Sequence, residues 1–395
     1  MVDFDESKRL KSLPRKYMSK QAEAIANYEK QGIDIINLGR GNPDLPTPQH
    51  IVDRLKEAVD VQSNHGYPPY NGKKSLKQAI VAFYKREYDV DLDPDTEIAI
   101  FNGSIIAVAA LPQCLLNPGD TIMFPEPAFP MYYSAVKLAE AHLYGLPVKE
   151  EDGFLPDYNA IPTQIANRTK LLLLNYPNNP TGAVATSHFF AETVQFATKH
   201  NIPVFHDMAY GSIGFDGHKP LSFLQTKGAK EIGVEVYTMS KAYNMAGWRV
   251  AFAVGNPSII AGINRFVEHA YGNVFGAVQD AAAAALTSDQ DCVRQITDIY
   301  NQRRDTLVNG LNKIGWHVRP SAGTFFVWAK VPEGYSSEQF SALLLDKAHV
   351  AVIPGEAFGQ HGAGYVRISL VSSEERLLEA VQRIKDANIL RYQKV

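Results

Sequence analysis

The chain has 395 residues, of which 45% are hydrophobic and 21% charged, and its formal net charge is -3. This length exceeds what one hydrophobic core usually serves, so two domains are expected. The balanced charge does not predict the basic surface that a nucleic-acid-binding protein needs. The two cysteines, Cys114 and Cys292, lack the spacing of a zinc site or a disulfide framework, so we expect no bound metal.

The N-terminal segment and the apolar runs of the sequence indicate where in the cell the protein is expected. The first residues lack the apolar core of a signal peptide. No apolar run approaches the ~20 residues of a membrane-spanning helix. We therefore expect a cytoplasmic protein that does not bind a membrane.

The middle of the chain predicts strands that alternate with helices. Strand candidates lie at residues 97–101, 121–124, 169–175, 202–207 and 234–238. Helical stretches are predicted at residues 105–116 and 189–199. Strands joined by crossover helices predict an α/β fold with a mainly parallel sheet covered on both faces.

The last third of the chain changes character and predicts a smaller α+β domain. Its elements are a long helix at 298–314, a strand at 323–329, a helix at 337–348, strands at 350–353 and 365–370, and a final helix at 373–387. The N-terminal arm is expected to join this domain, because chain termini often lie close together. We therefore predict a large domain over residues 46–290 and a small domain formed by residues 1–45 and 291–395.

Polar side chains follow four of the predicted strands, and ligands bind beyond the carboxyl ends of parallel strands. In chain order these are Gly103 and Ser104, Asn179, Asp207 and Tyr210, and Lys241 and Arg249. A glycine that opens a helix favours an anion, because free N–H groups and the helix dipole both attract it. Asn179, Asp207 and Lys241 are separated by 28 and 34 residues, close to one strand–helix–strand step of ~30. The spacing predicts that all three converge on one crevice.

This combination of side chains favours pyridoxal 5'-phosphate as the ligand. An aspartate can pair with the pyridine nitrogen, a lysine can form a Schiff base and act as a general base, and an arginine with hydroxyls can hold the phosphate. Each residue alone could also have an ordinary structural role, since an aspartate after a strand often caps a helix and a lone lysine usually faces solvent. The glycines at residues 39–41 and 66–72 match neither a dinucleotide fingerprint nor a P-loop.

Three motifs then identify a family resemblance. They are Asn-Asn-Pro-Thr-Gly at 178–182, Asp-Met-Ala-Tyr at 207–210, and Thr-Met-Ser-Lys at 238–241 followed by Asn-Met-Ala-Gly-Trp-Arg at 244–249. On these the chain resembles the class I and II aminotransferases of pyridoxal-phosphate fold type I, from residue 38 to residue 369. The stretches 175–186, 211–224 and 243–256 resemble bacterial enzymes that transaminate methionine or other neutral amino acids.

The resemblance implies a role for each matching cofactor residue. It makes Lys241 the Schiff-base lysine and Asp207 the partner of the pyridine nitrogen, while Asn179 and Tyr210 bond the phenolic oxygen. It assigns the phosphate to Gly103, Ser104, Ile105, Thr238, Ser240 and Arg249. Catalysis is thereby expected from Lys241, Asp207 and Tyr210.

The resemblance also implies residues for stacking, for the substrate and for a second subunit. Phe129 would stack on the cofactor ring. Arg367 would clamp the substrate α-carboxylate, with Gly41 and Asn179 close to it. Tyr67 would reach the phosphate of the neighbouring subunit, which predicts a homodimer with shared active sites.

Two positions depart from the pattern or stay open. Close relatives usually carry a small or basic residue after the phosphate-site Gly-Ser pair, whereas Ile105 and Ile106 stand here. Backbone donors survive this change, but a side-chain contact from residue 105 is lost. Arg40 either approaches the substrate side chain or faces solvent.

The expected activity is transfer of an amino group between an L-amino acid and a 2-oxo acid by a ping-pong mechanism. The expected donor is neutral, either methionine-like, aromatic or branched, because no second arginine for a dicarboxylate can be identified. One alternative is a carbon–sulfur lyase that works by β-elimination on the same scaffold. A second is a non-enzymatic, ligand-sensing regulator domain, although the chain lacks a basic N-terminal helical module of the kind such regulators carry.

Overall fold

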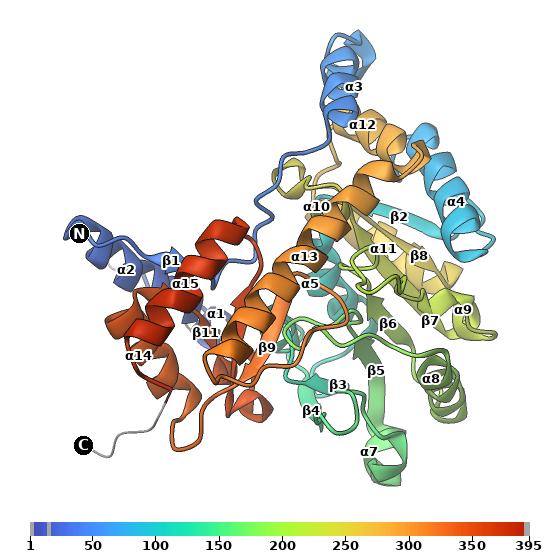
Figure 1. The fold of residues 1–395 in the computed structure, drawn as a ribbon. Helices are drawn as coiled ribbons and strands as arrows, with labels where there is room; N and C mark the ends of the chain where they lie inside the picture. The colour runs from blue at the N-terminus through green and yellow to red at the C-terminus, as the bar shows by residue number, and fades with distance from the viewer. Residues whose placement is uncertain (1–3, 14–16, 391–395) are drawn as a thin grey trace.

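The computed structural model describes residues 4–13 and 17–390, and its larger part is built on a seven-stranded sheet (Figure 1). The strand order is β2-β8-β7-β6-β5-β3-β4. β8 runs antiparallel to both of its neighbours, and the other adjacent pairs are parallel, which confirms the predicted α/β fold with a mainly parallel sheet. The strands are β2 (Ile98–Phe101), β3 (Thr121–Glu126), β4 (His142–Pro147), β5 (Thr169–Leu174), β6 (Val204–Asp207), β7 (Gly233–Thr238) and β8 (Ala251–Gly255).

Side chains that alternate along each strand give this sheet two buried apolar faces. Leu172 and Leu174 join a core with residues of α4, α8 and α12, whereas Leu171 and Leu173 join a core with residues of α5, α6 and α11. Because both faces are covered, β5 is a continuous apolar run. The helices are α4 (Lys74–Tyr88), α5 (Ser104–Leu115), α6 (Pro130–Leu138), α8 (Ser187–His200), α11 (Pro257–Ala270) and α12 (Gly276–Thr287).

Shorter helices and one outlying helix complete this part. The helix α3 (Gln49–Val59) packs on α12 at the upper edge of the view in Figure 1. Three short helices, α7 (Thr163–Arg168), α9 (Ala229–Ile232) and α10 (Met239–Ala242), directly precede or follow strands of the sheet. The helix α10 begins where β7 ends, which brings the predicted Schiff-base lysine to the carboxyl edge of the sheet.

The last third of the chain forms a smaller α+β unit, as predicted. A three-stranded antiparallel sheet has the order β11-β12-β9 and packs with α14 and α15 around a separate core. Its elements are β9 (Phe326–Lys330), α14 (Ser337–Ala348), β10 (Val350–Ala351), β11 (Ile353–Pro354), a 3-10 helix η5 (Gly355–Phe358), β12 (Tyr365–Ser369) and α15 (Glu374–Asp386).

The long helix α13 (Asp291–Lys313) begins earlier than the predicted start at residue 298. Gln290 adopts a positive φ of 66° just before it and accepts a hydrogen bond from the Tyr243 hydroxyl, so this residue fixes the turn that starts the helix. Val293 belongs to the core of the large sheet, whereas Ile296 belongs to the core of the small one. The helix therefore links the two cores, and the domain boundary at residue 290 stays a prediction.

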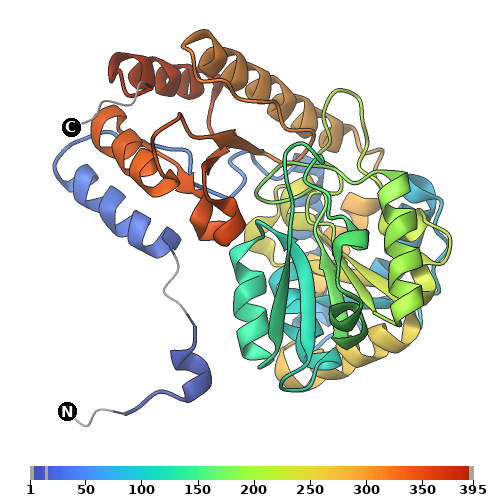
Figure 2. The same cartoon turned by 90° about the horizontal axis from the view of Figure 1, so that it is seen from below.

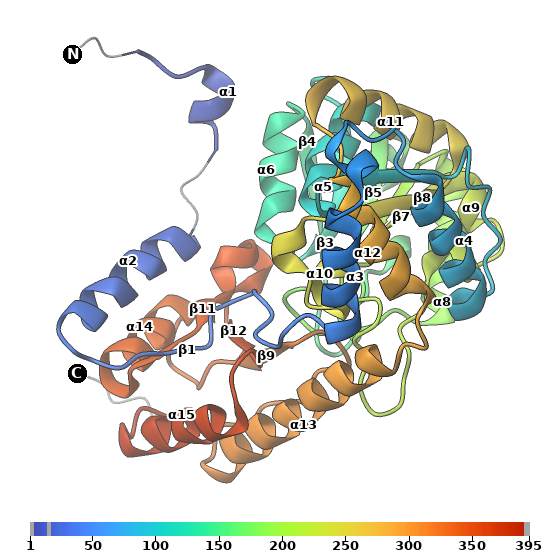
Figure 3. The ribbon, with the colours of Figure 1, turned by 90° about the horizontal axis from the view of Figure 1, so that it is seen from above.

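The N-terminal arm lies against the C-terminal third. The strand β1 (Ile36–Asn37) pairs in parallel with β10, and Arg376 and Arg383 of α15 form ion pairs with Asp34. The helix α2 (Tyr17–Lys30) lies beside α14 (Figure 2), where Ile25 joins a small apolar cluster. The short helix α1 (Lys8–Lys11) lies farther out along the arm (Figure 3). Within residues 4–13 and 17–390, no helix combines the length and apolar character needed to cross a bilayer.

Candidate active site

A cavity of about 490 Å³ opens at the carboxyl ends of the parallel strands, between the large sheet and residues of the small one. Twelve of the fourteen predicted site residues line it: Gly41, Ser104, Ile105, Phe129, Asn179, Asp207, Tyr210, Thr238, Ser240, Lys241, Arg249 and Arg367. The spacing argument thus led to the correct convergence of Asn179, Asp207 and Lys241. The described residues contain no cluster of three or more His, Cys, Asp or Glu side chains that could hold a metal ion.

The turn between β2 and α5 forms a cradle for an anion. Gly103 has a φ of 88°, and a Cβ atom at this position would lie 2.2 Å from Nη2 of Arg249. Only glycine therefore lets the guanidinium group lie against the start of α5. Ser104 and Ile105 are the first two residues of this 12-residue helix, where free N–H groups and the helix dipole favour a negative charge. The isoleucine at residue 105 leaves that backbone feature intact.

Two hydroxyl groups complete the polar side of the cradle. Thr238 ends β7 and caps α10, and its hydroxyl lies 2.9 Å from that of Ser240. Both side chains are buried and line the same cavity as Arg249. A guanidinium group, two hydroxyls and a helix N-terminus form a donor set that suits a phosphate group.

Asp207 is a buried carboxyl group at the end of β6. The Tyr132 hydroxyl donates a hydrogen bond of 2.8 Å to Oδ2, and the Ala209 N–H donates one of 3.2 Å to Oδ1. Asn175 also binds the main-chain carbonyl of Asp207 at 2.7 Å. Burial raises the pKa of the Asp207 carboxyl, whereas the bond from Tyr132 acts to lower it. A cationic or N–H-bearing ring would stabilise the ionised carboxylate here.

Lys241 is the single lysine among the described residues that line the cavity. Its Nζ donates a hydrogen bond of 2.8 Å to the carbonyl oxygen of Gly41, which ties the large unit to the N-terminal arm. Burial, together with the positive charges of Arg367 and Arg249, lowers the pKa of the Lys241 amine to about 8. An amine with such a pKa is partly neutral near physiological pH, as a nucleophile or a general base requires.

Arg367 of β12 is a buried cation with no acidic partner among the described residues. Its Nη1 donates to Oδ1 of Asn179 at 2.9 Å and its Nη2 to the carbonyl of Gly39 at 3.0 Å, while its Nε is buried without a hydrogen-bond partner. The guanidinium group also lies over the Phe326 ring, 3.9 Å from its centroid. A buried, unpaired arginine at a cavity wall points to an anionic ligand, and not to a structural ion pair.

Two aromatic side chains form other walls of the cavity. Phe129 precedes α6 and meets the Tyr132 ring edge-on, with the ring centroids 5.7 Å apart. Tyr210 is buried, and its ring packs edge-on against those of Phe325 and Phe326. The flat ring of Phe129 therefore offers a stacking surface, and the phenol of Tyr210 supplies a hydrogen-bonding group to the same cavity.

Three predicted or open positions lie outside the cavity lining. Gly103 borders Arg249 without lining the cavity itself. Tyr67 is 103% exposed and does not reach the cavity of its own chain, so its predicted contact with a second subunit stays a prediction. Arg40 is exposed and does not line the cavity. It stands between Gly39 and Gly41, whose carbonyl oxygens accept hydrogen bonds from Arg367 and Lys241.

Several lining residues were missed in the sequence. Tyr132 and Asn175 hold Asp207, and Met18, Val108 and Phe326 add apolar surface. Asn175 directly follows the β5 apolar run, so its position could have suggested a role. Tyr132 lies three residues after Phe129 on α6, and helical spacing was the only signal for it. Met18 and Phe326 come from the other unit, and nothing local predicts that they meet the large sheet.

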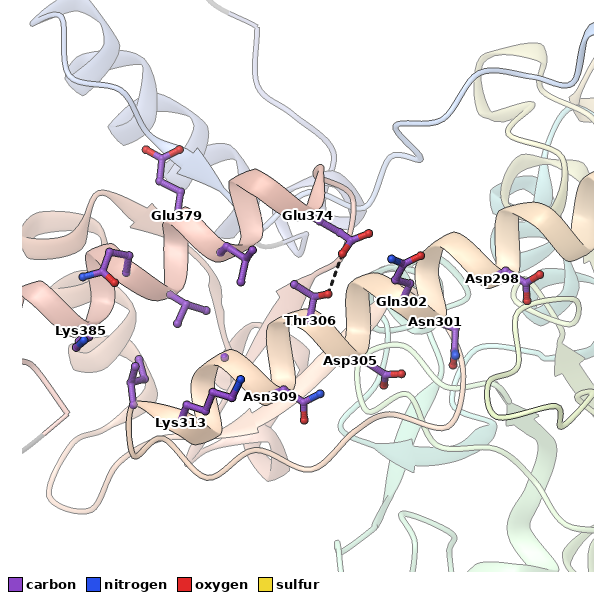
Figure 4. A pocket seen from close by; sticks show the side chains of 15 residues that line it. Asp298, Asn301, Gln302, Asp305, Thr306, Asn309, Lys313, Glu374, Glu379 and Lys385 are labelled. Carbon is purple, nitrogen blue, oxygen red and sulfur yellow. Dashed lines mark hydrogen bonds between the residues drawn. The ribbon is translucent and has the colours of Figure 1, made fainter.

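A second hollow of about 1040 Å³ lies between α13 and α15 (Figure 4). Its lining side chains are largely exposed and polar, and Thr306 donates a hydrogen bond of 3.0 Å to Glu374 across it. Its two lysines, Lys313 and Lys385, are both exposed. The hollow therefore lacks a buried, unpaired cation such as Arg367 of the strand-end cavity, which remains the candidate active site.

Comparison with known proteins places this geometry in a family. The model for class I and II aminotransferases matches residues 33–384. The chain is 53% identical over 388 residues to the L-glutamine--4-(methylsulfanyl)-2-oxobutanoate aminotransferase of Bacillus subtilis, covering 98% of each chain. It is 42% identical over 386 residues to the LL-diaminopimelate aminotransferase of Halothermothrix orenii, covering 98% of this chain and 99% of that one.

A solved structure agrees with these relatives. The substrate-bound BacF structure from Bacillus subtilis superimposes with a TM-score of 0.94 at 47% identity, covering 98% of each chain. The relatives are amino-group transferases, so the chain is an enzyme and the hypothesis of a non-enzymatic regulator domain is not retained. The chain belongs to the class I and II aminotransferases.

Proposed function

We propose that this aminotransferase binds pyridoxal 5'-phosphate in the strand-end cavity and transfers an amino group from a neutral L-amino acid to a 2-oxo acid. The observation that carries the proposal is that the Lys241 amine, the Asp207 carboxyl and the Arg249 cradle line one cavity. When bound, the cofactor supplies an aldehyde that reacts with amines and a pyridine ring that accepts electrons from the substrate. Homodimer assembly in the cytoplasm, with Tyr67 completing the partner's site, is part of the same proposal.

Each group of this chain has a task that its environment suits. Lys241 carries a proton to and from the substrate carbon at Nζ, because its lowered pKa lets it exist in both states near pH 8. Asp207 would hold the ring nitrogen of the bound cofactor, and Asn179 and Tyr210 would hold its phenolic oxygen. Arg367 binds the substrate α-carboxylate. In a ping-pong reaction the same cavity receives the amino acid first and the 2-oxo acid second.

The lining of the cavity supports a neutral substrate side chain. Its cations are Lys241, Arg249 and Arg367, and the proposal engages all three. Met18, Val108 and other apolar residues form much of the remaining wall. The relative of 53% identity is named for L-glutamine and 4-(methylsulfanyl)-2-oxobutanoate, so we propose a methionine-like substrate, with aromatic or branched donors as the next choices.

A donor screen tests the proposed substrate class. Purified enzyme is given 2-oxoglutarate or 4-(methylsulfanyl)-2-oxobutanoate as acceptor, and kcat/KM is measured for methionine, glutamine, leucine, phenylalanine and LL-diaminopimelate. The proposal expects the methionine-like pair to lead. A preference for LL-diaminopimelate, the substrate in the name of the Halothermothrix orenii relative, would overturn the substrate assignment and leave the family unchanged.

The carbon–sulfur lyase alternative differs by its products. A lyase forms pyruvate and ammonia from cysteine-like substrates without an acceptor, whereas a transaminase forms a 2-oxo acid only when an acceptor is present. We expect acceptor-dependent product. Ammonia release without acceptor at a comparable rate would favour the lyase.

Replacing Gly103 by alanine is expected to weaken binding of the cofactor at least about 10-fold, the cost of ~1.4 kcal/mol in lost phosphate contacts. The added Cβ atom would displace the Arg249 guanidinium group, whose Nη2 lies 2.2 Å from the Cβ position. Gly32→Ala is the matched control, because Gly32 has a similar positive φ of 78° and open space around it. Fluorescence titration with pyridoxal phosphate measures both variants, and equal affinities would contradict the cradle.

Replacing Arg367 by lysine is expected to raise KM for both the amino acid and the 2-oxo acid by about 10- to 100-fold. Lysine keeps the charge but cannot make a bidentate contact with a carboxylate. Arg168→Lys, at an exposed position on α7, is the control and should leave KM unchanged. A change confined to kcat would show that Arg367 does not bind the α-carboxylate.

Reaction of the Lys241 amine in the cofactor-free protein is expected to rise with pH and reach half its maximum near pH 8. The deprotonated amine is the reactive form, and burial with two nearby arginines lowers the pKa to about 8. Labelling with fluorodinitrobenzene followed by peptide mapping measures this rate at one lysine. A midpoint near the ordinary lysine value of 10.5 would contradict the environment described here.

A further inference from the structure

The groups proposed to bind ligands in the cavity are divided between the large and the small unit of the fold. Those of this chain that would hold the cofactor in its own cavity lie between residues 103 and 249, in the part of the chain that forms the large sheet. Arg367, which would hold the substrate α-carboxylate, lies on β12 of the small sheet. The distance between the cofactor and the carboxylate site therefore depends on how firmly the two units are held together beside the cavity.

The segment after β11 meets the large unit at Phe358, the last residue of η5. The carbonyl oxygen of Phe358 accepts a hydrogen bond of 2.8 Å from the Ala128 N–H, and it lies 2.8 Å from the Tyr133 hydroxyl. Ala128 and Tyr133 stand on either side of the proposed stacking residue, Phe129, around the start of α6. The Phe358 ring is buried, and its centroid lies 4.9 Å from the guanidinium carbon of Arg367. Phe358 thus contacts both the stacking segment and the carboxylate arginine.

A buried carboxyl group holds the Tyr133 hydroxyl at this junction. Oε1 of Glu126, the last residue of β3, lies 2.6 Å from the hydroxyl oxygen, and only 4% of Glu126 is exposed. From the small unit, Nε2 of His361 lies 3.7 Å from Oε2 of the same carboxyl group. The phenol has one proton and two acceptors within reach, so its hydrogen bond is shared between the carboxyl group of the large unit and the Phe358 carbonyl of the small unit.

Two glycines leave the room that this contact needs. Gly359 directly follows Phe358 with a φ of 111°, and a Cβ atom there would overlap the Tyr133 hydroxyl. A Cβ atom at Gly145 of β4 would overlap Oε2 of Glu126. A larger residue at either position would push the phenol or the carboxyl group away, so their close approach depends on glycine on both sides.

We propose that Tyr133 is a positioning residue for the substrate. Through the Phe358 carbonyl it holds the small unit, and with it Arg367, at the distance from Phe129 that the substrate requires. This role rests on the proposed function, in which Arg367 binds the α-carboxylate and Phe129 stacks on the cofactor ring. Tyr133 does not line the cavity, so it acts only through its neighbours. Without its hydroxyl, the two units are expected to separate more often, and a smaller fraction of molecules then has a complete site.

This role predicts a difference between substrate affinity and cofactor affinity. Tyr133→Phe should raise KM for the amino acid and the 2-oxo acid by about 3- to 10-fold, the effect of one hydrogen bond. Bound substrate contacts Arg367 and the large unit together and so restores their arrangement, which should keep kcat within about twofold of the wild type. Affinity for pyridoxal phosphate should not change, because the proposed cofactor groups of the cavity belong to the large unit.

Equilibrium binding of an unreactive substrate analogue tests the proposal in the enzyme loaded with pyridoxal phosphate. The probe is 4-(methylsulfanyl)butanoate, which has the carboxylate and side chain of the proposed substrate but neither an amino nor an oxo group. Its Kd is measured by calorimetry for the wild type, Tyr133→Phe and Arg367→Lys, and the Kd of pyridoxal phosphate is measured by fluorescence titration. Tyr28→Phe is the matched control, because it also loses a phenol bond to a carboxyl group, that of Asp346 at 3.3 Å, but joins α2 to α14 away from the large unit.

Tyr133→Phe and Arg367→Lys are both expected to bind the analogue more weakly than the wild type, while Tyr28→Phe binds it normally. If Arg367→Lys weakens binding and a folded Tyr133→Phe does not, the positioning role is overturned and the proposed function stands. An equal loss of affinity for pyridoxal phosphate in Tyr133→Phe would show that the hydroxyl supports the cofactor groups, which also overturns the role. If Arg367→Lys binds the analogue normally, the proposed task of Arg367 is refuted, and the positioning role is refuted with it.

A substitution on the opposite side of the junction gives an independent test. Gly359→Ala places a Cβ atom against the Tyr133 hydroxyl and should weaken binding of the analogue by about 10-fold. Gly364→Ala is its control and should leave the Kd unchanged, because Gly364 also has a positive φ, 85°, but open space around its Cβ position. When combined with Tyr133→Phe, Gly359→Ala should cost less, since the overlapping hydroxyl is gone. Fully additive losses would show that the two positions act independently and would overturn the proposal.

Discussion

Lys241→Ala is expected to lower kcat at least about 10³-fold with every donor, the combined loss of a nucleophile and a general base. Lys241 is the single lysine of the described cavity lining, so no neighbouring amine can take over. Its Nζ is held by the Gly41 carbonyl at 2.8 Å, which fixes the amine at the cavity wall. Steady-state transamination with the best donor of the screen measures the loss.

Two controls separate this loss from unfolding. Lys199→Ala changes an exposed lysine on α8 and should keep full activity. The cofactor-free Lys241→Ala protein should also melt within a few degrees of the wild type at pH 7. Burial lowers the pKa of this amine to about 8, so below that pH the folded chain bears the cost of a buried charge, and the alanine variant no longer does. Full turnover by a folded Lys241→Ala variant would refute the assignment.

Asp207→Asn is expected to lower kcat/KM by about 10²- to 10³-fold, the loss that follows when one preorganised electrostatic group is removed from a site. Asparagine has the shape of aspartate but no negative charge to keep a pyridine nitrogen protonated. The comparison is with Tyr132→Phe, which leaves the carboxylate and removes the 2.8 Å hydrogen bond to it. That variant should lose about 10-fold or less.

The Asp207→Asn substitution should lower activity without lowering the thermal stability of the cofactor-free protein. Burial raises the pKa of Asp207, so its charged form is disfavoured in the folded chain, and this cost appears as pH rises above the ordinary aspartate value of 3.8. The cofactor-free Asp207→Asn protein should therefore be at least as stable as the wild type at pH 7, by thermal melting, while its activity is low. An Asp207→Asn enzyme with near-normal kcat/KM would show that the carboxylate does not serve the reaction.

The sequence predicted the site well where local pattern and topology coincide. Asp207 ends one strand that is covered on both faces and Lys241 follows another, and such strands are apolar runs that sequence reveals. Parallel topology then brings their ends together, which the residue spacing alone indicated. The long helix was recognised too, but its first turns were missed because Gln290 starts the helix with a tertiary contact to Tyr243.

Elements without such a pattern were not predicted. The strand β4 lies at the sheet edge, and five of its six residues are exposed or half-buried, so it has no buried apolar run. The antiparallel strand β8 follows Arg249 after two residues, and a short turn there does not resemble a crossover connection. The contact of Phe326 with Arg367 joins two strands of the small sheet, and the Met18 contact joins the N-terminal arm to the cavity. The first contact depends on strand pairing within the small sheet and the second on how the arm packs against the large unit, and no local sequence signal encodes either.

Borohydride reduction of the enzyme loaded with pyridoxal phosphate tests the central claim most directly. Reduction fixes the cofactor carbon to the amine that carries it, and peptide mapping by mass spectrometry then identifies the residue. We expect the label on the peptide that contains Lys241, and none in Lys241→Ala treated in the same way. A label on a different lysine, or no label in an enzyme saturated with the cofactor, would contradict the account.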